Sequence, residues 1–160
     1  MPNWIEGTMK LRGRREDIKR FFIEGLDYSN WPKAEDRENQ VIDKSGKNFI
    51  AFSFRNEPHI QGTRRAFITC DFVYMDEDEG VVCVNVKQAW YFCEEGSRSK
   101  DIETWKSISD KFNIDIRLYG IERGMHFTQE IIILRNREPI INVKRYADWD
   151  WECPFPNMGG

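Results

Sequence analysis

The first segment of the chain, 4–12, alternates between apolar and polar positions. A period of two is typical of a strand that buries one face. The apolar side of this strand carries Ile5, Gly7, Met9 and Leu11. The next segment, 14–24, changes to helical spacing, with an apolar stripe formed by Ile18, Phe21 and Phe22. The chain is therefore expected to begin with a strand and an amphipathic helix, which Gly25 ends.

Later segments continue the same two periodicities. Further strands are predicted at 48–54, 65–74, 80–91, 115–122, 127–135 and 140–146, and a second helix at 101–112. The strands 65–74 and 80–91 are expected to form one hairpin. The resulting order, β-α-β-β-β-α-β-β-β, predicts an α+β fold. This fold is a two-layer sandwich, ferredoxin-like with a split β-α-β unit, in which two helices lie on one face of a largely antiparallel sheet extended by extra strands.

The domain organisation follows from length and polarity. A chain of 160 residues is long enough for one domain with its own core. We predict a single domain over 1–147, with a loop insertion at 27–47 where the sequence is polar and irregular. The remaining residues, 148–160, form an aromatic and acidic C-terminal tail.

Charge and cysteine usage limit the function classes. The net charge of −3 makes the chain mildly acidic. Because a nucleic-acid binder usually needs a basic surface, nucleic-acid binding by this chain would require a local cluster of cations. No apolar run approaches the roughly 18 residues of a membrane span, so no membrane partner is expected. The four cysteines form no Cys-x-x-Cys pair, and we expect reduced thiols in a cytoplasm.

Few residues suggest catalysis. The two histidines are far apart in the sequence and the cysteines are scattered, so no metal, iron–sulfur cluster or other cofactor is predicted. An enzyme would have to work through Cys93, expected in an exposed loop, or through His126 on a glycine turn. Cys83 falls in a strand expected to be buried, where a thiol is usually inert. A non-enzymatic protein is the favoured interpretation.

Two features could bind a partner. One is a row of four carboxylates at a turn: Asp76, Glu77, Asp78 and Glu79. A basic partner would be attracted to this turn, although ordinary solvation is the simpler alternative. The other feature is the tail, where Trp149 and Trp151 either cover the protein's own sheet or form a partner surface or dimer contact.

A basic surface is the alternative binding site. Its cations lie in the first strand and at the start of the first helix: Lys10, Arg12, Arg14 and Arg15. Lys10 and Arg12 share the polar face of the strand. If the cations converge, this patch would bind nucleic acid despite the acidic total.

Several short motifs resemble a known family. The chain opens Met1-Pro2-Asn3-Trp4, continues as strand, Gly13 and helix, and later runs from Trp90 through the second predicted helix to Leu118-Tyr119 and Glu122-Arg123-Gly124-Met125-His126-Phe127. These features are similar to the YubB-type ferredoxin-like family of small phage and plasmid proteins, over 1–25 and roughly 81–137. The resemblance implies a ferredoxin-like fold, a mobile-element origin and the cytoplasm of a bacterial host, and it supplies no catalytic residues.

These observations together predict a non-enzymatic phage or mobile-element accessory protein that binds a host protein or ribonucleoprotein. The specific form we expect is inhibition of a host defence system such as a CRISPR effector, because acidic turns and aromatic surface suit the occlusion of a basic nucleic-acid channel. The alternative is a nucleic-acid-binding module that uses the basic strand face. A homo-oligomer is compatible with either function.

Overall fold

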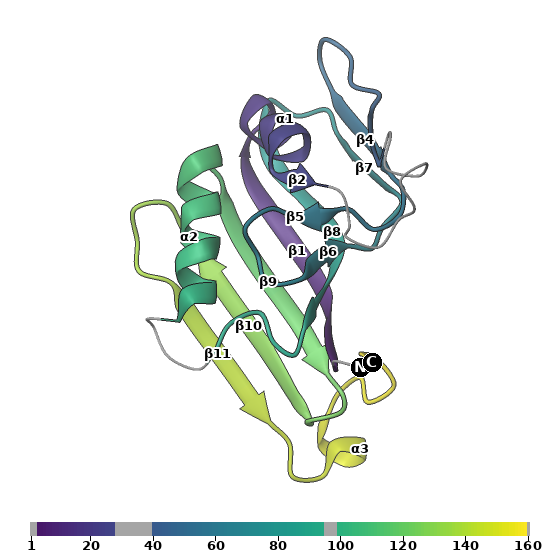
Figure 1. Cartoon of the computed structure of the whole chain (residues 1–160), viewed down its shortest axis with the longest axis vertical. Coiled ribbons are helices and arrows are strands. Elements are labelled where there is room, and N and C mark those ends of the chain that lie inside the picture. Colours follow the sequence, from purple (N-terminus) through teal and green to yellow (C-terminus); the bar gives the residue numbers. More distant parts are fainter. Residues whose placement is uncertain (1–2, 28–39, 95–98, 160) are drawn as a thin grey trace.

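The computed structural model describes residues 3–27, 40–94 and 99–159, and its largest part is an eight-stranded antiparallel sheet (Figure 1). In spatial order its strands are β11 (Ile140–Arg145), β10 (Phe127–Ile133), β9 (Asp115–Glu122), β1 (Trp4–Arg14), β8 (Glu79–Ala89), β6 (Ala66–Ile68), β5 (His59–Ile60) and β2 (Leu26–Asp27). The first strand of the chain, β1, is paired along both of its edges, with β8 and with β9.

A smaller sheet and three helices complete the described part of the chain. The smaller sheet has β4 (Ile50–Phe54) in the middle, between β3 (Val41–Asp43) and β7 (Phe72–Met75). The helices are α1 (Arg15–Glu24), α2 (Lys100–Phe112) and the one-turn α3 (Trp149–Glu152).

The fold class predicted from the sequence is wrong. The described chain is mostly β, with 44% of its residues in eleven strands and 19% in three helices. Its wide antiparallel sheet and separate small sheet are not a two-layer α+β sandwich of the ferredoxin-like type. The alternation of apolar residues identifies most strands, but it carries no information about which strand pairs with which.

The strand predicted at 65–74 shows this failure directly, because it is two strands in different sheets. Phe67 of β6 is the register partner of Lys87 in β8, whereas Val73 of β7 lies opposite Phe52 in β4. β7 and β8 follow each other in the chain but do not pair, so the predicted hairpin is wrong. The second sheet gains stability because the inward side chains of β7 are buried in the main core.

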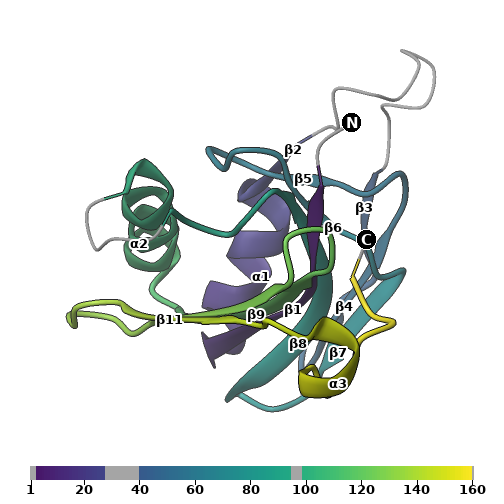
Figure 2. The ribbon, with the colours of Figure 1, turned by 90° about the horizontal axis from the view of Figure 1, so that it is seen from below.

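The core lies on the face of the large sheet that α1 and α2 cover (Figure 2). Phe21 of α1 packs edge-on against Phe112 of α2, with ring centroids 5.5 Å apart. Phe22, also in α1, contacts Phe52 of β4 at 5.1 Å. α1 therefore connects the helical layer to the smaller sheet.

A pair of glycines makes room for a loop over the middle of the sheet. Gly7 of β1 and Gly120 of β9 are register partners. A Cβ on Gly120 would lie 2.6 Å from the ring of Phe92, and a Cβ on Gly7 would lie 1.9 Å from the carbonyl oxygen of Tyr119. Phe92, in the loop after β8, is fully buried at this place. Larger residues at either glycine would displace the loop or the strand.

One buried amide holds the same loop. The Oε1 atom of Gln129 in β10 accepts the backbone N–H groups of Phe92 at 2.8 Å and Cys93 at 3.2 Å. Its Nε2 atom donates to the carbonyl of Cys93 at 2.8 Å. Gln129 thus satisfies loop backbone groups that would otherwise be buried without partners.

The predicted loop insertion and tail are described in part. Of the insertion at 27–47, Asp27 ends β2 and Val41–Asp43 form β3, while 28–39 lie outside the described residues. In the tail, Trp149 and Cys153 pack with Ile121 of β9. The boundary between a 1–147 domain and a 148–160 tail stays a prediction.

Candidate functional site

Among the residues that the structure describes, few cover the face of the large sheet away from α1 and α2. Along β1 exposed and buried residues alternate, and Lys10, Arg12 and Arg14 are on the exposed side. We call this side of β11, β10, β9, β1 and β8 the outer face. In the described part of the chain, α3 and the tail cover one end of it, near Ile121 (Figure 2).

The outer face carries more cations than carboxylates, although the whole chain is acidic. Register and alternation place these cations on it: Lys10, Arg12, Arg14, Lys87, Arg117 and Lys144. The carboxylates that share it are Glu6, Glu79, Asp115 and Glu130. Lys10 and Arg14 have no ion-pair or hydrogen-bond partner among the described residues. Local charge on this face is therefore favourable for an anionic ligand.

A small hollow lies at the centre of the outer face. Tyr119 of β9 stands directly between Thr8 of β1 and Glu130 of β10, because it is the register partner of both. Together with Lys10 and Arg117, these side chains line a hollow of about 220 Å³, which we call the central hollow. The side chain of Tyr119 is 40% exposed, so its ring forms an accessible aromatic surface among charged groups.

The charged side of the central hollow, formed by Arg117 and Glu130, is held in place by hydrogen bonds. The Oε1 atom of Glu130 accepts from Nε of Arg117 at 2.8 Å, and Oε2 accepts from Nδ2 of Asn142 at 3.1 Å. Burial works against ionisation, but these hydrogen bonds outweigh it and hold the pKa of Glu130 below its usual value. Glu130 is therefore an anion at neutral pH, in a defined position.

The aromatic side of the central hollow, formed by Tyr119, is uncharged at neutral pH. Burial and the nearby phenol of Tyr146 raise the pKa of Tyr119 above its usual value. The Tyr119 hydroxyl consequently keeps its proton at neutral pH, and the ring can take part in stacking without a charge of its own.

A second carboxylate lies between two arginines at the edge of the outer face. The Oδ2 atom of Asp115 pairs with Arg12 at 2.6 Å, and Oδ1 pairs with Nε of Arg135 at 3.2 Å. Burial alone would raise the pKa of Asp115, but the backbone N–H of Arg135 and the two guanidinium groups outweigh burial and lower it. Arg12 is thus partly neutralised, while its side chain stays 56% exposed.

The fourth cation predicted for nucleic-acid binding is not on this face. Arg15 begins α1, and its side chain is only 13% exposed. Its guanidinium pairs with Asp78 at 2.8 Å and donates to the carbonyl of Asn48 at 2.6 Å. One predicted nucleic-acid residue therefore contacts one predicted partner-binding residue. The structure brings Lys10, Arg12 and Arg14 together and separates Arg15 from them.

The two predicted partner-binding features lie at opposite ends of β1. Arg14 is opposite Glu79, the last residue of the acidic turn, whereas Glu6 is opposite Ile121, against which the tail packs. A strand of this length between Glu6 and Arg14 spans about 26 Å. Asp76, Glu77, Asp78 and Glu79 are all exposed, but they do not form one surface with the tryptophans.

The two tail tryptophans have different environments. Trp149 is 5% exposed, stacks on His126 at 5.3 Å and donates its indole N–H to the carbonyl of Pro156 at 2.9 Å. Trp151, two residues later, is 85% exposed. Trp149 therefore covers the protein's own sheet, and Trp151 alone is accessible to a partner.

The predicted settings of two cysteines are wrong. Cys93 is 1% exposed in the main core, where burial and the Asp101 carboxylate raise the pKa of its thiol to about 12. Such a thiol is protonated at neutral pH and is a poor nucleophile. Cys83 is exposed, because its alternation in β8 places it on the outer face opposite Lys10. All four cysteines are free thiols.

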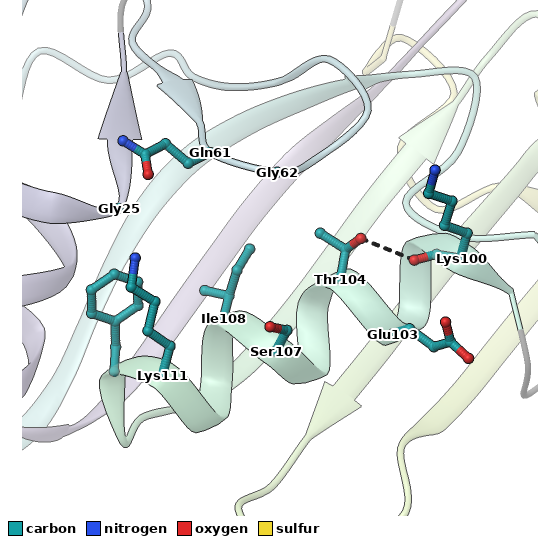
Figure 3. A pocket seen from close by; sticks show the side chains of 10 residues that line it. Gly25, Gln61, Gly62, Lys100, Glu103, Thr104, Ser107, Ile108 and Lys111 are labelled. Carbon is teal, nitrogen blue, oxygen red and sulfur yellow. Dashed lines mark hydrogen bonds between the residues drawn. The ribbon is translucent and has the colours of Figure 1, made fainter.

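A larger hollow, of about 470 Å³, lies on the other side of the molecule between α2 and the loop at 61–62 (Figure 3). Lys100 and Lys111 stand toward its two ends, with Glu103 and Thr104 near Lys100. The lining mixes both charges with an apolar strip from Ile108. Unlike the central hollow, it does not lie on the cation-rich outer face. We therefore take the central hollow as the better candidate.

Sequence reasoning missed the residues that complete the central hollow. Arg117, Tyr119 and Glu130 lie on the polar side of their strands, a signal present in the sequence. Their meeting with Thr8 and Lys10 depends on β1 pairing with β9, more than a hundred residues away, and no local pattern shows that pairing.

Comparisons of the chain with protein-family models, with curated proteins and with solved structures found no match. The resemblance to the YubB-type family stays a prediction. Within the described ranges no helix is both long and apolar enough to cross a bilayer. The same residues contain no cluster of three or more histidine, cysteine or acidic side chains placed to hold a metal ion.

Proposed function

We propose that this protein is a non-enzymatic binding protein whose outer face binds single-stranded nucleic acid. One observation carries the proposal: the ring of Tyr119 is 40% exposed in the middle of a cation-rich sheet, beside Lys10 and Arg117. Single-stranded binders combine aromatic platforms, on which unpaired bases stack, with cations that follow the backbone. The outer face offers both within neighbouring strands.

The row of cations on β1 supports a strand of nucleic acid laid along it. Lys10, Arg12 and Arg14 are two residues apart, so their Cα atoms span about 13 Å along the strand. Lys10 and Arg14 are without partners in the described residues and need no ion pair broken before they meet phosphate. Arg12 would have to share its guanidinium with Asp115.

Binding to labelled oligonucleotides tests the proposal. We expect single-stranded RNA or DNA to bind with an affinity that falls steeply with salt, and duplex DNA to bind more weakly. The double variant Lys10→Glu/Arg14→Glu should weaken binding at least about tenfold, since it reverses two contacts. The matched control Lys100→Glu/Lys111→Glu makes the same charge change on α2, on the helical side. Equal weakening by both variants, or no binding by the wild type, would contradict the proposal.

A second candidate function is inhibition of a host defence complex, such as a CRISPR effector, inside a bacterial cell. It is favoured by Trp151, which is 85% exposed and lies between Asp150 and Glu152. An exposed Trp with flanking carboxylates suits a basic protein surface. The test is capture of purified effector complexes by the wild type and by Trp151→Ala, with Trp90→Ala as a control at a 40% exposed Trp. Capture that survives Trp151→Ala removes this candidate.

A further inference from the structure

The central hollow has a lining that suits the binding of one nucleic-acid base, and we call it the base seat when it is considered as a base-binding site. Thr8, Tyr119 and Glu130 follow one another across three adjacent strands, with the aromatic residue in the middle. Neighbouring strands are about 4.8 Å apart, so Thr8 and Glu130 flank Tyr119 at roughly equal separations. A planar ring laid on Tyr119 would thus present one edge to Glu130 and the opposite edge to Thr8 and Lys10.

The two edges of the hollow differ in hydrogen-bonding character. Glu130 is an acceptor, and a carboxylate has about four acceptor sites. Arg117 uses two of these sites on Oε1 and Asn142 uses one on Oε2. One acceptor site on Oε2 is therefore left for a further donor. On the other side, the ammonium of Lys10 is a donor without a partner among the described residues.

We propose that the central hollow binds an unpaired cytosine in preference to uracil, stacked on Tyr119, with Glu130 accepting from the N4 amino group. This inference rests on the proposed binding of single-stranded nucleic acid. Cytosine has a donor at N4 and an acceptor at O2 at the two ends of its Watson–Crick edge, with the N3 acceptor between them, so N4 can meet Glu130 while O2 meets Lys10 and Thr8. Uracil has the same size and stacking surface but carries a carbonyl at position 4, which would face the carboxylate without a proton between them.

Arg117 positions the selecting carboxylate. Its Nε atom lies 2.8 Å from Oε1 of Glu130, so Oε1 is occupied and the remaining acceptor site is on Oε2, beside the hydrogen bond from Asn142. The same ion pair keeps Glu130 close to Tyr119 and limits its repulsion of a nearby phosphate. Glu130 is thus a specificity-determining residue, and Arg117 acts through it.

The test measures the affinities of oligocytidine and oligouridine of equal length by fluorescence anisotropy. For the wild type we expect about tenfold tighter binding of oligocytidine, the discrimination typical of one good base contact. In Glu130→Gln the preference should fall to about twofold or less, because an amide both donates and accepts and so suits either base. Affinity for both oligonucleotides should rise, because a carboxylate near the phosphates is removed.

Two further variants separate stacking from selection. Tyr119→Phe keeps the ring and should keep both affinity and preference, whereas Tyr119→Ala should weaken both oligonucleotides together. Thermal unfolding of each variant checks that the fold is retained.

The outcomes distinguish this inference from the proposed function. If the wild type binds both oligonucleotides equally, or if Glu130→Gln keeps the cytosine preference, the base seat is refuted while nucleic-acid binding stands. If neither oligonucleotide binds, the proposed function fails and the base seat fails with it.

Discussion

Arg15 and Asp78 form an ion pair, with Nη2 and Oδ1 2.8 Å apart, that fastens the start of α1 to the acidic turn before β8. The backbone joins them a second time, because the N–H of Arg15 donates to the carbonyl of Asp78 at 2.8 Å. The contact has two unequal partners, since the side chain of Arg15 is 13% exposed and that of Asp78 is 93% exposed.

We expect the two members of this pair to respond differently to substitution. Arg15→Ala removes the ion pair and the bonds to the carbonyls of Asn48 and Asp76, and should destabilise the fold by about 1–3 kcal/mol. Asp78→Ala removes only an exposed carboxylate, so the loss should be under about 1 kcal/mol. Urea unfolding measures both. Arg14→Ala is the matched control, and it should leave stability unchanged but weaken oligonucleotide binding.

Gln129 is expected to be essential to the loop over the sheet. Gln129→Leu has a similar volume but leaves three buried backbone groups of Phe92 and Cys93 without partners. Each unsatisfied group costs about 1–3 kcal/mol, so the variant should lose several kcal/mol or fail to accumulate as folded protein. Asn142→Ala, which removes an exposed amide in β11, is the control. A Gln129→Leu protein with wild-type unfolding would show that the loop does not depend on this amide.

The pH dependence of the free energy of unfolding should reveal how much the Asp115 carboxylate stabilises the fold. Its pKa is lowered in the folded protein, so the stabilisation it gives is fully present above the ordinary value of 3.8 and is lost as pH falls through the folded-state pKa. Asp115→Asn cannot pair with two arginines, so it should be less stable than the wild type at pH 7. The difference should shrink as pH falls below the ordinary value of 3.8, because the unfolded chain then takes up a proton at Asp115 that the folded protein still resists. A difference that is constant from pH 7 to pH 3 would mean that Asp115 acts through packing alone.

Thiol reactivity should follow exposure and not position in the chain. In the native protein iodoacetamide should alkylate Cys83 first, because that residue is exposed on the outer face. Cys93, with a pKa raised to about 12, and the buried Cys153 should react only when the protein is unfolded in urea. Mass spectrometry of digested samples measures each site. Rapid native alkylation of Cys93 would revive it as a candidate nucleophile.

Local patterns in the sequence predict much of the secondary structure. The period-two segment at 4–12 became β1, and the helical stripe at 14–24 became α1, with bounds changed by a residue or two. The alternation in β1 also places Lys10 and Arg12 on one exposed face, which the structure has. These successes depend on interactions between residues close in the chain.

Predictions failed wherever the outcome depends on distant contacts. Arg15 continues the run of cations in the sequence, but the change from strand to helix at that residue turns it toward Asp78. Cys83 lies in an apolar stretch that suggests burial on both sides, yet no described residue covers the outer face of β8 there. Cys93 follows a strand, as a loop residue does, but its loop is folded over the sheet and held by Gln129. Burial and partner choice are properties of the assembled sheet.

The central place of β1 has a consequence for biosynthesis. β1 leaves the ribosome well before its two neighbours in the sheet, because β8 and β9 begin only at Glu79 and Asp115. Until those segments emerge, the strand has both edges open and its apolar side exposed, the condition in which nascent chains attract chaperones or associate with one another. Refolding should also be slow for a chain of this size, because the central pairings close long loops. A version of the chain permuted to begin at β8 would place β8, β9 and β1 in a different order of emergence, and a higher yield of folded protein from it would show that late closure limits production of the natural order.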